Sequence, residues 1–202
     1  MAAVERAIAA VRQGLPILLP TDTVYGLAGA ATRPEDAERV YRLKGRAENQ
    51  PTALLTATVD ALLECIPELR GNPEAIARAL LPGPYTLVLP NPARRFPWLT
   101  GEQPAAIGVR VPVLPEPARR VAEAVTCLLA TSANEPGGPS PASLDEVPAR
   151  IRAGCGAELD VGPLPGTPST VLDFTGAAAV VIREGAAPAA EAIARVSALG
   201  LR

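Results

Sequence analysis

Short apolar runs alternate along this chain with longer amphipathic segments, and this alternation limits the fold more than any other feature. A run such as Leu15–Leu19 has the length of a strand, whereas Ala3–Gln13 has apolar residues at helical spacing and stops at Gly14. Strands that alternate with helices are typical of layered α/β domains. We therefore expect an α/β fold with a mixed sheet, and we assign residues 1–202 to a single domain.

The expected elements follow from apolar runs and helix-start residues. Thr32-Arg33-Pro34-Glu35 has the pattern of a capping box that opens a helix toward Leu43, and Asn72 before Pro73 has that of a helix cap. The expected strands are Leu15–Leu19, Thr52–Thr56, Tyr85–Leu89, Ile107–Val111, Cys127–Thr131, Ser169–Asp173 and Ala179–Arg183. The other expected helices are Val59–Cys65, Asn72–Leu80, Pro117–Val125, Leu144–Arg152 and Ala189–Leu199. The candidate linkers, both too short to separate domains, are Pro90–Pro104 and Glu135–Pro141.

Composition removes several classes of function. The chain has no histidine, which excludes Ser-His-Asp and Cys-His catalysis and histidine metal ligation. Its three cysteines show no CxxC spacing, so we interpret them as buried small hydrophobic residues. Apolar runs end well before the roughly 18 residues of a membrane span. The first segment lacks the apolar block of an export signal, so we expect a cytoplasmic protein with no membrane association.

Polar side chains crowd the turn after the first strand, where Thr21, Asp22, Thr23 and Tyr25 follow one another closely. Loops beyond strand ends line the ligand crevice of open α/β sheets. The same residue types also form ordinary Asx or Ser/Thr turns that cap the next segment. Both interpretations stay open for this turn.

The sole lysine of the chain, Lys44, lies two residues before Arg46 at the end of an expected helix. Two cations that flank a glycine can converge on a polyphosphate, the lysine as a compact charge and the arginine as a planar fork. Alternatively, cations at a helix C-terminus complement the helix dipole. The chain has no GxxxxGK[ST] segment, which excludes a P-loop nucleotide site.

Polar residues also interrupt or follow the later strands. Arg110 lies within an apolar strand, so it either faces water or meets an anion. Thr131–Asn134 and the glycine-rich Pro136–Pro141 offer N–H donors for phosphate or ribose oxygens, or form plain turns. Pro168–Asp173 and Val181–Gly185 each place a hydroxyl or a cation at a strand end, which a hairpin with solvated ends also explains.

Together and in order, these segments closely resemble the YrdC/Sua5 family, the threonylcarbamoyl-AMP synthases. The matching segments are PTDTVYGL, KGRAENQP, LPGPYTLVL, IGVRVP, TSAN with GGPSP, PSTVLDF and IREGA, from Leu15 to Gly185. The resemblance implies a twisted open α/β sheet with flanking helices around a deep concave cleft. It further implies that L-threonine, bicarbonate and ATP give threonylcarbamoyl-adenylate and pyrophosphate, the first stage of t6A modification in tRNA.

The resemblance also implies which residues bind each substrate. Threonine would be held by Thr23, Arg110, Ala130 and Ser169, with Arg110 taking the carboxylate. ATP would be held by Lys44, Arg46, Gln50, Ala106, Ser132, Asn134, Ser140 and Arg183. Lys44 and Arg46 would stabilise charge, and the sequence identifies no general base. Mg²⁺ would enter with the triphosphate, without dedicated protein ligands.

Three positions depart from the family pattern. Ala47 replaces the proline of KxRP, Pro136 replaces the serine of TSANxSG, and Leu55 lies where some members place a histidine against threonine. Two other functions stay open: a double-stranded RNA-binding module that uses the same basic concave surface, and a family paralogue with an altered reaction. The t6A machinery would be the downstream partner, and direct binding of tRNA or other RNA stays open.

Overall fold

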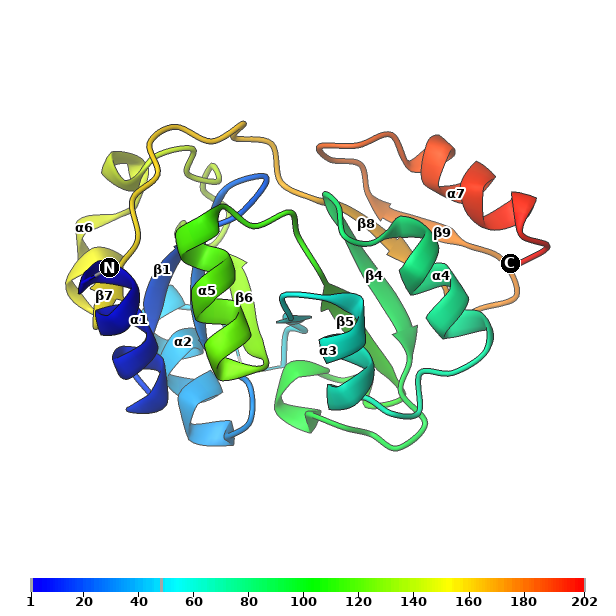
Figure 1. Cartoon of the computed structure of the whole chain (residues 1–202), viewed down its shortest axis with the longest axis horizontal. Coiled ribbons are helices and arrows are strands. Elements are labelled where there is room, and N and C mark those ends of the chain that lie inside the picture. The colour runs from blue at the N-terminus through cyan, green and yellow to red at the C-terminus, as the bar shows by residue number, and fades with distance from the viewer. Residues whose placement is uncertain (1, 48, 202) are drawn as a thin grey trace.

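The computed structural model describes residues 2–47 and 49–201. Within this part, nine strands form one sheet in the order β7-β1-β2-β6-β3-β5-β4-β8-β9 (Figure 1). The strands are β1 Ile17–Pro20, β2 Tyr25–Ala30, β3 Ala53–Leu55, β4 Tyr85–Pro90, β5 Ala106–Arg110, β6 Leu128–Ser132, β7 Ala157–Glu158, β8 Thr170–Asp173 and β9 Val180–Arg183. The helices are α1 Ala2–Arg12, α2 Pro34–Lys44, α3 Val59–Cys65, α4 Asn72–Leu80, α5 Glu116–Val125, α6 Ala149–Ala153 and α7 Ala189–Ala198.

The sheet is mixed, which confirms the predicted fold class. Strand pairs β1–β7, β3–β5 and β4–β8 are parallel, and the other neighbouring pairs are antiparallel. In Figure 1, β7, β1, β2 and β6 lie with α1, α2, α5 and α6 in one half of the molecule. Strands β5, β4, β8 and β9 lie with α3, α4 and α7 in the other half. The polypeptide ends lie on opposite sides of the molecule.

The two faces of the sheet are covered unequally. One face carries large apolar side chains, such as Leu54, Val109 and Leu129, and packs against α2, α3, α4, α6 and α7. The other face packs against α1 and α5 through residues of β1, β2, β3 and β6, such as Leu19 and Leu128. Because side chains alternate along a strand, this second face continues over β5, β4, β8 and β9, where none of the helices in the described residues joins its apolar cluster. That uncovered part of the face is available for a ligand.

Prolines shift two helix starts from their predicted caps. Pro34 begins α2, so the cap is Arg33 rather than Thr32, and no side-chain cap forms there. Gly71, at φ 68°, precedes α4 as its cap, which places Asn72 inside the helix. The predicted helix over residues 144–152 is broken as well, into the 3-10 turn Leu144–Glu146 and α6, because Pro148 lies between them. Proline fixes the backbone at N1 or N2 of a helix, which overrides weaker side-chain preferences.

The segment from Leu159 to Pro168, which we call the strap, connects β7 in one half to β8 in the other along one edge of the molecule (Figure 1). The Tyr25 hydroxyl donates to Gly162 O at 2.8 Å and accepts from Val161 N at 3.1 Å. Gly166 N donates to Thr23 O at 2.9 Å. The strap is therefore tied to the start of β2.

The helices of the described ranges are all too short or too polar to cross a membrane.

Candidate functional site

A cavity of about 580 Å³ lies on this second face of the sheet, beside the part that α1 and α5 cover, and it extends from β2, β6 and β3 over β5, β4 and β8. Its volume is within the range of small-molecule sites. Its floor is made of small residues on adjacent strands: Gly26, Ala53, Ala106, Gly108 and Ala130. These residues alternate with the large core-facing side chains, so the strands fill the core on one side and leave room on the other.

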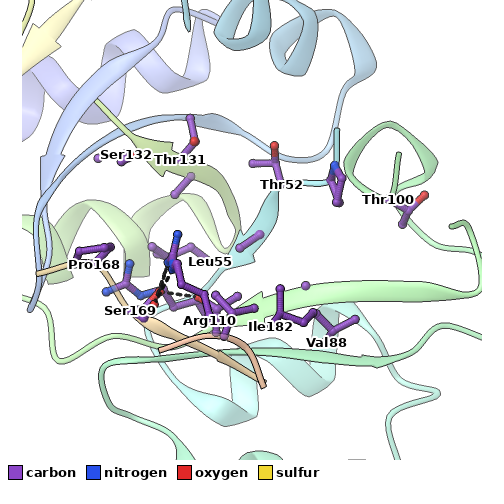
Figure 2. Close-up of a pocket in the computed structure, with 18 of the residues that line it drawn as sticks. Thr52, Leu55, Val88, Thr100, Arg110, Thr131, Ser132, Pro168, Ser169 and Ile182 are labelled. Atoms are coloured by element: carbon purple, nitrogen blue, oxygen red, sulfur yellow. Dashed lines mark hydrogen bonds between the residues drawn. The ribbon is translucent and has the colours of Figure 1, made fainter. Parts of the chain in front are cut away.

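The walls of the cavity are basic and hydroxyl-rich on one part and apolar on another. Its basic lining residues are Arg46, Arg110 and Arg183. In Figure 2, Thr52, Thr131 and Ser132 lie on one side, and Arg110, Ser169, Val88 and Ile182 lie on the opposite side. A site with three guanidinium groups beside hydroxyls suits anionic ligands, and carboxylates and phosphates are the groups that arginine binds best.

Arg110 lies at the end of β5, and its side chain is only 11% exposed. Its Nη2 donates to Asp22 Oδ1 at 2.6 Å and to Thr23 Oγ1 at 2.6 Å. Burial lowers the pKa of the Arg110 guanidinium, the facing Asp22 carboxylate opposes this, and nearby Arg183 adds to it. Arg110 thus meets a carboxylate of the protein itself, an arrangement that the sequence left open.

Arg183 and two hydroxyls form the neighbouring corner of the cavity. Arg183 Nη2 donates to Ser169 O at 2.7 Å and to Ser169 Oγ at 3.3 Å. Ser169 Oγ and Thr86 Oγ1 are 2.9 Å apart. Strands β8 and β9 are paired antiparallel, so the predicted hairpin interpretation is correct, yet its polar ends face the cavity.

Arg46 and Thr52 face the cavity with unsatisfied groups. Arg46 Nη2 donates to Pro51 O at 2.6 Å and Nη1 donates to Thr131 Oγ1 at 3.2 Å, but Nε is buried and has no partner among the described residues. Thr52 Oγ1 is also buried, and it too lacks a partner in the part of the chain that the structure describes. Burial lowers the pKa of Arg46. Because buried polar groups are nearly always hydrogen-bonded, these orphans point to a polar ligand.

Lys44 does not line the cavity. Its Nζ donates to Ser132 O at 2.6 Å, to Asn134 Oδ1 at 2.7 Å and to Asn134 O. Ser132 Oγ also donates to Asn134 Oδ1. Burial and, as a smaller cause, the charge of Arg46 together lower the pKa of Lys44 to about 8. The lysine therefore supports the end of β6 from behind.

The structure brings most of the predicted site residues together. The predicted residues that line the cavity are Arg46, Ala106, Arg110, Ala130, Ser132, Ser169 and Arg183. Thr23 lies fully buried behind Arg110, and Asn134 lies with Lys44 behind Ser132. Gln50 and Ser140 are not in the cavity lining.

Thr86 and Thr52 line the cavity but were not among the predicted site residues. Thr86 faces the cavity between core-facing Tyr85 and Leu87, as a hydroxyl in an otherwise apolar strand. The alternation of side chains along this strand places Thr86 on the face opposite to Tyr85 and Leu87, and this could have indicated that it lines a site. Nothing local distinguishes Thr52, because only the fold brings it to the same side of the cavity as Thr131.

A protein-bound metal ion has no ready ligand set here. No group of three or more histidine, cysteine or acidic side chains able to hold a metal occurs within residues 2–47 and 49–201. Asp173 and Glu102 do line the cavity, but Asp173 Oδ1 already accepts from Thr175 N and Oγ1, and Glu102 accepts from Asn49.

The chain is similar to known proteins over most of its length. The sequence model of the Sua5/YciO/YrdC family, described as "Telomere recombination", matches residues 9–185. The threonylcarbamoyl-AMP synthase of Pyrococcus abyssi is 31% identical over 182 residues, which are 90% of this chain and 53% of that protein. That of Bacillus subtilis is 28% identical over 184 residues, again 90% of this chain and 53% of that protein. The chain thus spans about half the length of these two relatives.

Solved structures agree with the sequence comparison. The crystal structure of P. abyssi Sua5 complexed with L-threonine has a TM-score of 0.85 and 31% identity, and the match covers 96% of this chain and 56% of that one. The crystal structure of E. coli YciO has a TM-score of 0.81 and 27% identity, and the match covers 94% of this chain and 92% of that one.

Proposed function

The chain belongs to the Sua5/YciO/YrdC family, and from this we propose that it is a threonylcarbamoyl-AMP synthase. The reaction would convert L-threonine, bicarbonate and ATP into threonylcarbamoyl-adenylate and pyrophosphate. The observation that carries the proposal is the cavity in which Arg46, Arg110 and Arg183 converge beside hydroxyls and unpartnered polar atoms. Two relatives named threonylcarbamoyl-AMP synthase and a neighbour that was solved with L-threonine support it.

The cavity suits an amino acid at one end and a triphosphate along the rest. Arg110 would take the threonine carboxylate, with Ser169 and Thr86 beside it. Arg46 and Arg183 would neutralise phosphate charge, together with N–H and hydroxyl groups around Ser132. Lys44 would act indirectly, because its contacts hold Ser132 and Asn134 in place.

The chemistry needs alignment and charge neutralisation more than a strong base. The neutral amine of threonine and bicarbonate would give N-carboxythreonine and water. A carbamate oxygen would then attack the α-phosphorus of ATP, and the bond to the β-phosphate would break to release pyrophosphate. A cavity low in water favours the neutral amine, because desolvation disfavours an ammonium ion.

Magnesium remains part of the proposal. The cavity acids are few and already hydrogen-bonded, which fits an ion carried in by the triphosphate better than one held by the protein. Mg²⁺ would supply further neutralisation of the phosphate oxygens when bound.

The cellular setting is proposed on the same basis. The adenylate would be passed to the machinery that completes t6A on tRNA in the cytoplasm. Direct RNA binding would use exposed arginines around the cavity, and the salt dependence of a gel shift with duplex RNA tests it.

A synthesis assay tests the proposed function. Purified protein with ATP, Mg²⁺, L-threonine and labelled bicarbonate is expected to form a labelled adenylate and an equal amount of pyrophosphate. Omission of threonine should abolish both products. Pyrophosphate release that continues without threonine would show that the amino acid is not the substrate, as would transfer of label to another amino acid in preference to threonine. Arg183→Gln is expected to raise the KM for ATP by about tenfold or more.

A further inference from the structure

Asp22 forms a nearly buried ion pair with Arg110 inside the cavity wall. The two side chains are 12% and 11% exposed, and Arg110 Nη2 lies 2.6 Å from Asp22 Oδ1. Asp22 Oδ2 accepts from Val113 N at 3.0 Å. Strands β6 and β3 lie between β2 and β5, so this contact crosses the sheet face and does not follow the strand ladder. The Asp22 carboxylate therefore does more than stabilise its own turn, because its partners lie about ninety residues later in the chain.

Both hydrogens of the Arg110 Nη2 group are used in hydrogen bonds to the protein. Its two hydrogens go to Asp22 Oδ1 and Thr23 Oγ1. Thr21 Oγ1 donates to Val24 O at 2.7 Å, so in the 3.0 Å pair of hydroxyls Thr23 must be the donor and Thr21 the acceptor. The Thr23 hydroxyl oxygen is therefore free to accept from Arg110. The turn thus holds two acceptors, Asp22 Oδ1 and Thr23 Oγ1, in fixed positions for Nη2.

The remaining donors of Arg110 are its Nη1 group and its Nε–H. Nε is buried and has no hydrogen-bond partner within residues 2–47 and 49–201. A guanidinium that is clamped through one nitrogen and unpartnered through another is held in one orientation with spare capacity for an anion. Arg183 lies close enough to disfavour the charged form of Arg110, so without Asp22 two cations would face each other at this end of the cavity.

We propose that Asp22 is a positioning residue, which clamps the Nη2 group of Arg110 and so fixes this cavity-lining guanidinium in the orientation in which its Nη1 group binds the carboxylate of the amino-acid substrate. Asp22 itself is not in the cavity lining, so it acts through Arg110. The inference rests on the proposed function, in which Arg110 takes the threonine carboxylate.

Two variants test the clamp. Asp22→Asn removes the charge and replaces one carboxylate oxygen by an NH2 donor, so one of the two acceptor positions that face Arg110 Nη2 and Val113 N is lost. It is expected to raise the KM for L-threonine about tenfold, with less than a twofold change in kcat and in the KM for ATP. Asp22→Glu keeps the charge but lengthens the side chain, and is expected to raise the KM for threonine at least threefold. Asp60→Asn is the matched control, because Asp60 also accepts from an arginine Nη2, at 2.8 Å, on an exposed surface.

Calorimetry with L-threonine alone separates this inference from the proposed function. Wild-type protein that binds threonine but forms no adenylate would refute the proposed function. Weaker threonine binding by the two Asp22 variants would support the clamp even in that case. A threonine KM or Kd equal to the wild-type value in either variant would overturn the clamp. An equal rise in the KM values for threonine and ATP would overturn it as well, because it would indicate a general loss of structure. Absence of threonine binding by the wild type would overturn both.

Discussion

Lys44 is buried, and its Nζ lies 2.6 Å from Ser132 O and 2.7 Å from Asn134 Oδ1. An ammonium group has three N–H donors, and three protein oxygens accept from it here. A neutral amine has only two N–H donors and lacks the charge that strengthens each bond. Loss of the proton should therefore loosen the end of β6, which carries Ser132 at the cavity wall.

We predict that the affinity for an ATP analogue falls as pH rises from about 7 to about 9, because the pKa of Lys44 is lowered to about 8. The charged form, which holds Ser132 and Asn134, predominates below that pKa and is lost above it. Fluorescence titration with a labelled, non-hydrolysable analogue at each pH measures the effect. Lys44→Met should bind more weakly at pH 7 and should lack this pH dependence. A flat profile for the wild type would contradict the prediction.

Residue types in the sequence indicated the cations of the site, but not which of them line the cavity and which hold the surrounding chain in place. The single lysine followed by Arg46 pointed to anion binding, and Arg46 does line the cavity. Lys44 instead contacts backbone and amide oxygens of a segment about ninety positions later. Such contacts depend on how β6 approaches the end of α2, which no local pattern encodes.

At the scale of elements, the strands that form the cavity have one large and one small side. On β6, Leu129 is fully buried in the core, while Ala130 beside it lines the cavity. On β5, Val109 lies in the core and Gly108 in the cavity floor. Core stability and ligand space therefore depend on alternate positions of the same strands, and substitutions can separate them.

Leu129→Ala is expected to lower the free energy of unfolding by about 2–5 kcal/mol, because it leaves a cavity in a packed core. Urea denaturation followed by circular dichroism measures the change. Ligand affinity of the folded fraction should stay within about twofold of wild type. A loss below about 1 kcal/mol would mean that the site collapses around the shorter side chain and is less tightly packed than the structure indicates.

Gly108→Val is expected to keep the stability of the fold and to lose ligand binding. A Cβ at Gly108 would lie at ordinary contact distance, 3.7 Å, from Ala53 Cα, and a β-branched residue suits a strand. The side chain would rise into the cavity floor and exclude ligand. We expect thermal stability within a few degrees of wild type and at least a tenfold loss of adenylate synthesis. A variant that unfolds, or one that keeps full activity, would contradict this assignment of faces.

Element positions were largely predictable because they follow apolar runs, and α3 has the predicted bounds. The missed strand β2 is instructive, because YGLAGA contains two glycines and two alanines and has no apolar alternation. It is a strand because β1 and β6 pair with it on both sides. Its small residues leave room for Val40 against Gly29, where a Cβ would approach the Val40 side chain to 2.9 Å. Tertiary pairing decides such a segment, and local propensity does not.

At the scale of the whole molecule, the strap links the two halves of the sheet and ends at Pro168, which lines the cavity. Its bonds to Tyr25 and Thr23 place it next to the turn that holds Arg110. The sequence showed several prolines and glycines in this segment but not its path, because the partners of the strap lie some 135 residues earlier in the chain. The global arrangement of the site therefore depends on a few long-range hydrogen bonds as well as on the sheet.

Tyr25→Phe tests that dependence. The Tyr25 hydroxyl lies within 3.1 Å of Val161 N, Gly162 O and Asp160 Oδ1, and Phe removes it without changing the ring that fills the core. Because Val161 N and Gly162 O would lose their partner, the free energy of unfolding should fall by about 1–3 kcal/mol. Amide hydrogen exchange should accelerate over residues 160–166 and stay unchanged in α4, as measured by mass spectrometry. Tyr85→Phe, which removes the hydroxyl of a buried tyrosine on β4, serves as the control and should leave exchange in the strap unchanged. Equal exchange in wild type and Tyr25→Phe would show that the sheet alone holds the strap in place.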